Sequence, residues 1–258
     1  MRLLKVAIIK IDEILFNEYF MSKYNSICDS RLAYRFNRDM KLHYTVYSVS
    51  NQSLLTSLAQ KYGSDKGSNL LQNPYPWAPH TYTTYYEALF GHCREKITKV
   101  FECGIGSSDQ SVLSNMSSSG APGASLRMWR DYFPNAIIVG GDIDPKTIFF
   151  EDRIKSYVLD QTNPELINSF WLSVGEEQFD IIIDDGLHTF NAGITLFENS
   201  IARLKPNGVY IIEDITPADL LLFKSYFSNT SLIVNYITLF YGENKVGDDC
   251  LITIRKQP

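Results

Sequence analysis

Two short apolar runs in the second half of the chain each end at carboxylates. One run ends at Asp184-Asp185 and is followed by His188, and the other ends at Glu213-Asp214. If both runs are parallel strands of one sheet, these side chains meet at a single edge of that sheet. Carboxylates beside a histidine indicate a divalent metal ion and a general base.

The spacing of these residues suits a metal site shared by two neighbouring strands. Twenty-eight positions separate Asp185 from Glu213, enough for a strand, a helix and the return strand of one crossover. Mg²⁺ prefers a few carboxylate oxygens and fills its other positions with water or substrate oxygens. Such an ion could lower the pKa of a substrate hydroxyl and leave His188 to take the proton. The alternative is a plain strand-to-loop turn at Asp185, with His188 at a helix N-terminus.

The other histidines and a group of tyrosines have simpler interpretations. No acidic residues lie near these histidines in the sequence, and we expect them to be surface or packing residues: His43, His80 and His92. We expect three tyrosines to line a helix that packs on the sheet: Tyr82, Tyr85 and Tyr86.

Polar residues also follow three earlier strand-like runs. The first run ends at Glu102 and Gly104, the start of a Gly-x-Gly turn where the backbone can approach a ligand closely. The second ends at Asp142, in a place where an acid can accept hydrogen bonds from ribose hydroxyls. The third ends at Asp160-Gln161, which could contact an adenine amino group. Each acid could instead cap a helix, but their repetition at three strand ends favours a nucleoside ligand.

Strand-like and helix-like segments alternate from Lys99 onward, which is typical of parallel βαβ units. The last two β-rich runs are joined by a glycine-containing loop and predict an antiparallel pair. Strands are expected near Lys99–Gly104, Ala136–Asp142, Ser156–Asp160, Phe179–Asp184, Val209–Glu213, Leu232–Phe240 and Cys250–Arg255. Helices are expected near Ser125–Tyr132, Thr147–Arg153, Pro164–Leu172 and Thr189–Leu204, and from Pro217 to Phe227.

Composition limits the class of protein. With 258 residues, 45% of them hydrophobic, the chain can form one α/β core and a smaller appendage. The net charge of −5 and a pI near 5.4 argue against nucleic-acid binding, which needs clustered Lys and Arg, and favour a small-molecule ligand. The four scattered cysteines fit neither a zinc site nor a disulfide framework and are typical of a reducing cytoplasm. No signal peptide or membrane-spanning stretch is predicted, so we expect a cytoplasmic protein without a membrane partner.

Six segments of the chain carry a combination found in a known family. They are Phe101–Gly106 (FECGIG), Gly123–Pro134 (GASLRMWRDYFP), Gly141–Asp144 (GDID), Asp160-Gln161, Ile183–His188 (IDDGLH) and Ile212–Asp214 (IED). Together they resemble class I S-adenosylmethionine-dependent methyltransferases, in particular the metal-dependent macrolide-sugar O-methyltransferases of the mycinamicin and tylosin type. The likeness spans about Lys61 to Lys256.

The resemblance implies a Rossmann-like α/β fold, with a seven-stranded, mostly parallel sheet whose last strand is antiparallel. It also implies S-adenosylmethionine and Mg²⁺, or another divalent cation, as cofactors. Transferred by position, the residues lining S-adenosylmethionine would be Glu102 and Gly104 at the methionine part, Asp142 at the ribose, Asp160 and Gln161 at the adenine, and Asp185.

The resemblance also assigns the metal and the base. Mg²⁺ would be bound by Asp185, Glu213 and Asp214, and His188 would be the general base, with Asp185 also part of the catalytic machinery. The upstream segment Tyr62–Gly67 resembles the part of the family that folds over the cofactor, which makes Ser64 a further expected contact.

Two departures from the family affect the expected substrate and domains. Leu187 stands where family members often have serine, which should matter little because His188 and Asp185 are present. Residues 1–60 are expected to form a small appendage for oligomerisation or substrate shaping, before a methyltransferase domain at 61–258. Since this appendage is short, a small sugar is expected as acceptor, nucleotide-linked or destined for a surface polysaccharide such as a capsule. A homo-oligomer is also expected.

Two other functions are compatible with the same sheet. A nucleotide-sugar oxidoreductase is one, although Ser108 replaces the third glycine of a dinucleotide-binding turn and Asp142 lies far beyond the usual offset. A non-catalytic, methyltransferase-like binding subunit is the other, although all the carboxylates and His188 are retained.

Overall fold

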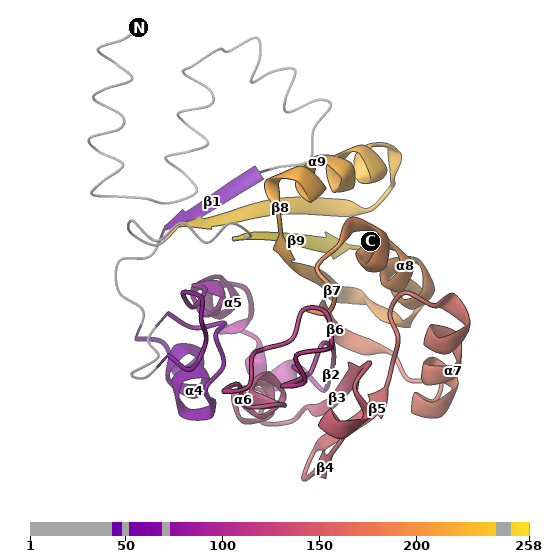
Figure 1. The fold of residues 1–258 in the computed structure, drawn as a ribbon. Coiled ribbons are helices and arrows are strands. Elements are labelled where there is room, and N and C mark those ends of the chain that lie inside the picture. Colours follow the sequence, from indigo (N-terminus) through magenta and orange to yellow (C-terminus); the bar gives the residue numbers. More distant parts are fainter. Residues whose placement is uncertain (1–42, 48–51, 69–72, 241–248, 258) are drawn as a thin grey trace, which may run out of the picture.

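The computed structural model describes residues 43–47, 52–68, 73–240 and 249–257, and the described strands form one nine-stranded sheet (Figure 1). Neighbouring strands follow the order β1-β8-β9-β7-β6-β2-β3-β5-β4. The strands are β1 (His43–Tyr47), β2 (Lys99–Cys103), β3 (Ile137–Asp142), β4 (Phe150–Glu151), β5 (Ile154–Val158), β6 (Phe179–Asp184), β7 (Leu204–Ile215), β8 (Ile233–Phe240) and β9 (Cys250–Arg255).

The sheet has the expected α/β topology. Strands β7, β6, β2, β3 and β5 are parallel neighbours, and β9 lies antiparallel between β7 and β8. The Rossmann-like, mostly parallel sheet with an antiparallel last strand is therefore confirmed. Two described strands extend the expected seven at the edges: β4 pairs antiparallel with β5, and β1 pairs parallel with β8.

The division of the chain at residue 60 stays a prediction. Residues 1–42 of the expected appendage lie outside the described part, whereas β1 belongs to the sheet. Helix α4 (Leu54–Tyr62) crosses the expected boundary and packs against α6 (Ala124–Tyr132).

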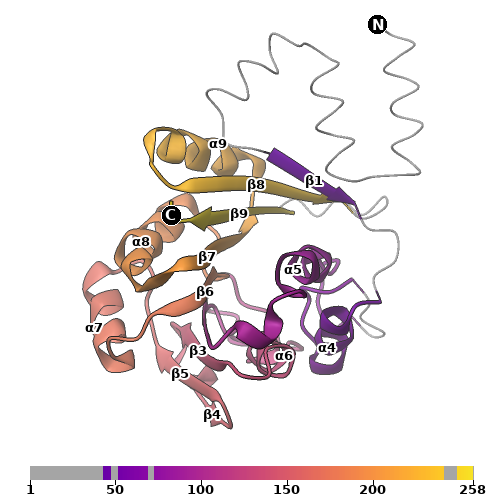
Figure 2. The ribbon, with the colours of Figure 1, turned by 180° about the vertical axis from the view of Figure 1, so that it is seen from behind.

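Helices cover both faces of the sheet. Helices α4, α5 and α6 lie on one face, and α7, α8 and α9 lie on the other (Figures 1 and 2). The helices not yet given are α5 (Tyr82–Phe90), α7 (Pro164–Val174), α8 (Phe190–Ser200) and α9 (Pro217–Tyr226), and short 3-10 turns occur at Arg94–Lys96, Pro145–Thr147, Ile201–Arg203 and Phe227–Asn229.

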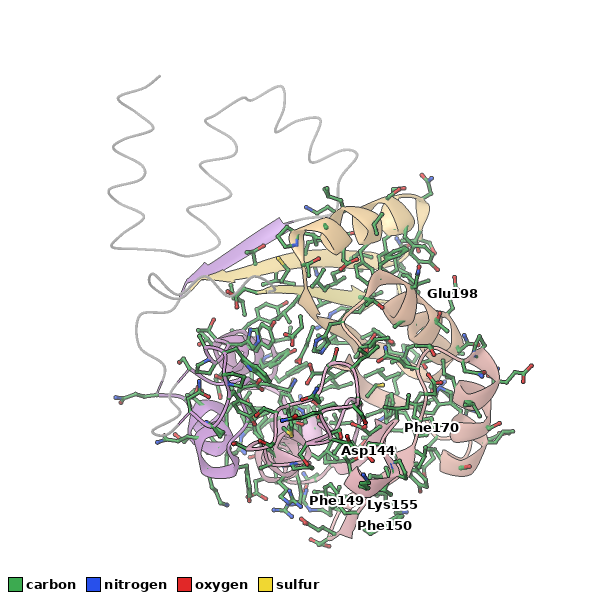
Figure 3. All side chains as sticks on the ribbon, in the orientation of Figure 1. Asp144, Phe149, Phe150, Lys155, Phe170 and Glu198 are labelled. Atoms are coloured by element: carbon green, nitrogen blue, oxygen red, sulfur yellow. The ribbon has the colours of Figure 1, made fainter. Side chains whose placement is uncertain are left out.

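Alternation along the central strands builds two apolar layers. Ile181 and Ile183 of β6 join the layer under α4–α6, which contains Trp129, while Ile182 joins the opposite layer, which contains Trp171. Side chains fill both layers, with Phe170 of α7 in the second (Figure 3). This packing fixes the carboxyl ends of the central strands, where the polar residues lie.

One expected helix is wrong. Thr147–Arg153 was expected to be helical, but it contains the end of a 3-10 turn and the strand β4, which turns back into β5. Arg153, in the turn, has a φ of 58°, a left-handed conformation that ends any regular helix.

No helix in the described part of the chain combines the length and the apolar character required to cross a bilayer.

Candidate active site

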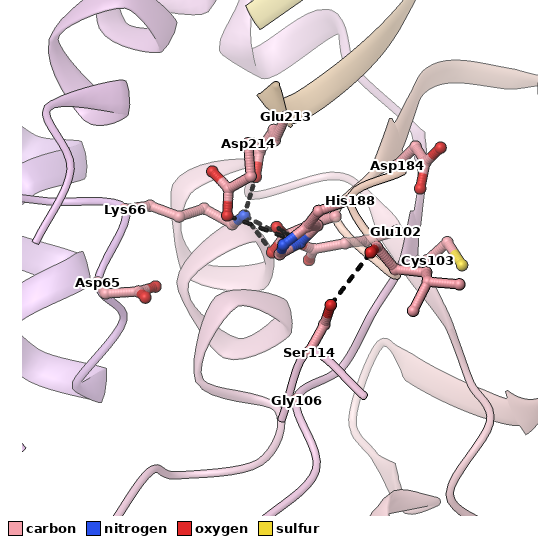
Figure 4. A network of polar contacts seen from close by, with 12 residues as sticks. Asp65, Lys66, Glu102, Cys103, Gly106, Ser114, Asp184, His188, Glu213 and Asp214 are labelled. Carbon is pink, nitrogen blue, oxygen red and sulfur yellow. Dashed lines mark hydrogen bonds and ion pairs between the residues drawn. The ribbon is translucent and has the colours of Figure 1, made fainter. Parts of the chain in front are cut away.

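The ends of β6 and β7 bring the predicted acids together. These strands are parallel neighbours, with Asp184 opposite Ile212, so Asp185 and Glu213 leave the sheet side by side. Single ligand atoms of Asp185, His188 and Asp214 lie within 4.8 Å of one another. His188 Nε2 is 3.3 Å from Asp185 Oδ1 and 3.6 Å from Asp214 Oδ2 (Figure 4). We call this half-exposed group the outer group.

Two members of the outer group have unusual backbone conformations. His188 has a φ of 58° and Asp214 a φ of 53°, in the left-handed region that residues with a Cβ rarely adopt. Such strain persists only where the surrounding structure enforces it, and it is concentrated at functional sites. Here it turns both side chains toward Asp185.

A second group of carboxylates lies deeper and surrounds a lysine. Ligand atoms of Glu102, Asp185 and Glu213 also lie within 4.8 Å of one another, and we call them the inner group. The ammonium of Lys66 is 2.6 Å from Asp185 Oδ2 and 3.3 Å from Glu102 Oε1, and it also contacts Glu213 Oε2 (Figure 4). Asp185 thus belongs to both groups, while the expected ligands Glu213 and Asp214 lie on different sides of it.

The Lys66 ammonium affects the pKa values of its three carboxylate neighbours unequally. Burial raises the pKa of Glu102 to about 7 although Lys66 opposes this effect, and burial also raises the pKa of Glu213. Burial acts in the same direction on Asp185, but Lys66 and His188 outweigh it and hold its pKa below the ordinary value. Asp185 is therefore the carboxylate that stays ionised most readily.

The outer group raises the basicity of its histidine. Burial lowers the pKa of His188, but the carboxylates of Asp214 and Asp185 outweigh that effect and raise it to about 10. The imidazole therefore carries a proton near neutral pH unless the charge of these carboxylates is balanced by another cation.

His80 packs in the interior, within the expectation of a surface or packing residue, and it also contacts two acids. His80 is buried, its Nδ1 lies 3.1 Å from Asp249 Oδ1, and its Nε2 lies 3.6 Å from Asp214 Oδ1. Its acidic neighbours are distant in sequence, so no local pattern indicates them. His43 lies in β1, and His92 is exposed.

The tyrosines of α5 pack as expected and also reach the site. Tyr82, Tyr85 and Tyr86 are all buried against the sheet layer. In addition, the Tyr82 hydroxyl donates to Asp214 Oδ1, and the Tyr86 hydroxyl donates to Glu213 Oε1. Helix α5 therefore holds both acids at the end of β7.

The glycine turn after β2 allows a close approach of two loops. Gly104 has a φ of 92°, and a Cβ at this position would lie 1.8 Å from the carbonyl oxygen of Asp185. The backbone N–H groups of Ile105 and Gly106 donate to Asp142 Oδ2, at 2.8 and 3.1 Å. Asp142, expected at a ribose, thus also fixes the shape of the turn.

The other residues expected at the cofactor have clear structural partners. Gln161 accepts from the Leu187 N–H at 2.7 Å and donates to Asp184 Oδ1 at 3.0 Å, so it fixes the loop that carries Asp185. Asp160 accepts hydrogen bonds from Thr162 and lines a cavity. Ser64 is buried and lines a second cavity, and Glu102 is fully buried against Lys66.

Two cavities meet at this edge of the sheet. The larger, of about 610 Å³, is lined by Gly104, Asp142, Asp160 and Gln161, and the smaller, of about 300 Å³, by Lys66, Trp77, His80, His188 and Asp214 among others. Both volumes are in the range of small-molecule sites. The residues that line both cavities are Gly104, Gly106, Ser114 and Asp185. A molecule bound in one cavity can therefore contact a molecule bound in the other, at the position of Asp185.

Curated proteins with similar sequences are O-methyltransferases by name. The chain is 35% identical over 161 residues to the 8-demethyl-8-alpha-L-rhamnosyl tetracenomycin-C 2'-O-methyltransferase of Streptomyces olivaceus, a match that covers 62% of this chain and 37% of that protein. It is 32% identical over 178 residues to the demethylmacrocin O-methyltransferase of Streptomyces fradiae, covering 67% and 42%. The chain thus spans about two fifths of the length of these relatives. No model of a known protein family matches the chain.

A solved structure has a similar fold. The MycE methyltransferase from the mycinamycin biosynthetic pathway, in complex with Mg and SAH, superposes with a TM-score of 0.57 at 25% identity. The match covers 80% of this chain and 55% of that chain.

Proposed function

Because the chain is a homologue of sugar O-methyltransferases and has the fold of the S-adenosylmethionine-dependent methyltransferases, we propose that it methylates a sugar hydroxyl. One observation carries the proposal: Asp185 of the outer group lines both cavities, and its partners His188 and Asp214 line the smaller one. The larger cavity would hold the methyl donor and the smaller one the sugar.

The residues fit the implied cofactors. Hard carboxylate oxygens are the ligands that Mg²⁺ prefers. Asp185 lies within 4.8 Å of Asp214 in the outer group and of Glu213 in the inner group, and these three acids would hold the ion. The larger cavity, lined by Gly104, Asp142, Asp160 and Gln161, offers the space for S-adenosylmethionine. The relative MycE was solved with Mg and SAH.

The chemistry divides between the bound groups and the side chains. When bound, S-adenosylmethionine supplies a methyl group on a sulfonium, and Mg²⁺ supplies a Lewis acid for the acceptor hydroxyl. Asp185, Glu213 and Asp214 would hold the ion beside the acceptor hydroxyl. His188 takes the proton of the hydroxyl at Nε2, for which its imidazole must be neutral, and cation binding by Asp185 and Asp214 favours that form. The chain thus positions the acceptor and removes its proton.

The smaller cavity supports a compact acceptor. Tyr75 and Trp77 stack at one wall, with ring centroids 5.2 Å apart, and the Trp77 Nε1–H donates to Asp65 at 2.8 Å. Aromatic rings offer a flat apolar surface to the C–H face of a sugar, and the acids around them favour a neutral ring over an anionic one. We propose a single sugar ring, nucleotide-linked or part of a surface polysaccharide precursor.

Two further expectations complete the proposal. A cytoplasmic location agrees with Cys93 and Cys103, which are free thiols in the described part of the chain. A homo-oligomer remains part of the proposal, with residues 1–60 as the segment that would mediate it.

A mass-spectrometric screen tests the proposal. The full chain is incubated with S-adenosylmethionine and a panel of nucleotide sugars, with Mg²⁺ or with excess EDTA. We expect a mass gain of one methyl group on at least one sugar, dependent on Mg²⁺ and lost in Asp185→Asn. Binding of S-adenosylhomocysteine with no product from any sugar would instead favour a non-catalytic binding subunit. Methylation that persists in EDTA and in Asp185→Asn would remove the metal from the mechanism.

A further inference from the structure

Lys66 lies against the carboxylate oxygens that a divalent ion would need. Its ammonium contacts Asp185 Oδ2 at 2.6 Å and Glu213 Oε2, and its side chain is only 3% exposed. The opposite oxygens of the two acids have other partners: Asp185 Oδ1 faces His188, and Glu213 Oε1 accepts from the Tyr86 hydroxyl. The two oxygens that converge between Asp185 and Glu213 are thus both engaged by one lysine.

The backbone around Lys66 holds it in this place. Helix α4 ends at Gly63 in a left-handed conformation, and the next N–H, of Ser64, donates to Ala59. The carbonyl oxygens of Asp65 and Lys66 accept from the backbone N–H groups of His80 and Thr83, at 2.7 and 3.0 Å. The segment is therefore fixed to α5, and a long lysine side chain from it reaches the sheet edge.

Glu102 gives the ammonium a second position. This carboxylate is fully buried in the same inner group, with Oε1 at 3.3 Å from the ammonium. A lysine that leaves Asp185 and Glu213 can stay paired with Glu102 and need not return to solvent. The inner group thus binds the Lys66 ammonium and offers it a second position at Glu102.

We propose that Lys66 is a built-in counter-cation that competes with the divalent ion for Asp185 and Glu213. The inference rests on the proposed metal site and assigns this lysine a positioning role. Without the ion, Lys66 keeps three close carboxylates from repelling one another; with the ion, it withdraws toward Glu102. Lys66 therefore weakens metal binding while it keeps the acids arranged for the metal.

Titration with Mn²⁺, followed by the electron paramagnetic resonance of the free ion, tests this role without any methyl transfer. We compare the wild-type chain with Lys66→Met, which keeps the length but removes the charge, and Lys66→Arg, which keeps a charge. The matched control is Lys61→Met, because Lys61 is 57% exposed and pairs with Asp131 outside the site. We expect Lys66→Met to lower the Kd for Mn²⁺ about tenfold, because the competing positive charge is removed, and the other two variants not to lower it.

Thermal unfolding provides the second readout. Lys66→Met should unfold at a lower temperature than the wild type in EDTA and regain more stability than the wild type on addition of Mn²⁺. A variant that folds only with the ion would support the inference most strongly. An unchanged or higher Kd in Lys66→Met, or a variant that is unfolded with and without the ion, would overturn it. If the wild type and Lys66→Met bind Mn²⁺ as expected but no sugar is methylated, only the proposed function fails.

Discussion

The imidazole of His80 lies 3.6 Å from Oδ1 of Asp214, on the opposite side of that carboxylate from His188. Tyr82 donates to the same Oδ1, and Asp249 holds the other nitrogen of the His80 ring. His80 and Tyr82 therefore occupy Oδ1 of Asp214, and Oδ2 faces His188 in the outer group. Partners of this kind orient a ligand without touching the metal.

Loss of the His80 ring should reduce both metal affinity and turnover. In His80→Ala, Asp214 loses one of the groups that fix its orientation, and we expect an affinity for Mn²⁺ about tenfold weaker and a similar loss in kcat/KM. Calorimetric titration of the metal and steady-state assays measure the two effects. His92→Ala is the matched control, since His92 is exposed. Equal metal affinity in both variants would leave His80 with a packing role only.

Removal of the proposed base should affect chemistry and leave cofactor binding intact. We expect His188→Ala to lower kcat by about 10²–10⁴-fold, the usual contribution of a positioned base. The affinity for S-adenosylhomocysteine should stay within about twofold, because His188 lines only the smaller of the two cavities. Leu187→Ser, at the neighbouring position, should retain activity. Near-normal turnover in His188→Ala would assign proton removal to another group.

A surface carboxylate should make part of the stability dependent on pH. Asp131 of α6 is partly buried, but hydrogen bonds from Tyr62, Lys61 and Arg130 outweigh burial and lower its pKa to about 2, from an ordinary value of 3.8. Since the folded-state pKa is depressed, the contribution to stability is complete above about pH 4 and is lost as the pH falls toward 2.

Urea unfolding of Asp131→Asn measures this contribution. We expect the variant to lose about 1 kcal/mol at pH 7, a value reduced by solvent screening because Asp131 is partly exposed. The difference from the wild type should shrink at pH 3. A difference that is equal at both pH values would assign the effect to packing between α4 and α6 rather than to charge.

The sequence predicts the sheet and its acidic edge well because both depend on local patterns. The acidic edge follows from two apolar runs that end in Asp184-Asp185 and Glu213-Asp214, because parallel strands end at one edge of a sheet. The β4–β5 hairpin was missed because Phe150–Glu151 is too short to form a recognisable strand pattern and Arg153 adopts its left-handed turn only in the fold.

The residues that the sequence did not identify are those whose partners are distant. Lys66 and Asp185 are 119 positions apart, and His80 and Asp249 are 169 apart. No periodicity or short motif encodes such pairs; they arise when α5 and the segment before it dock on the sheet edge. A buried lysine surrounded by acids is recognisable only after folding, because in sequence Lys66 follows a single aspartate and looks like an ordinary surface residue.

Trp77 should determine how well the acceptor binds. Its indole lines the smaller cavity, stacks on Tyr75 and is held by Asp65, but it is not part of the wall shared with the larger cavity. We expect Trp77→Ala to raise the KM for the sugar about 30-fold, since stacking and apolar contact each contribute about 1 kcal/mol, and to leave the KM for S-adenosylmethionine unchanged. Trp77→Phe keeps a ring but loses the N–H donor to Asp65, so its KM for the sugar should lie between those of the wild type and Trp77→Ala. If Trp77→Ala changes both KM values equally, the wall supports the whole site and does not select the acceptor.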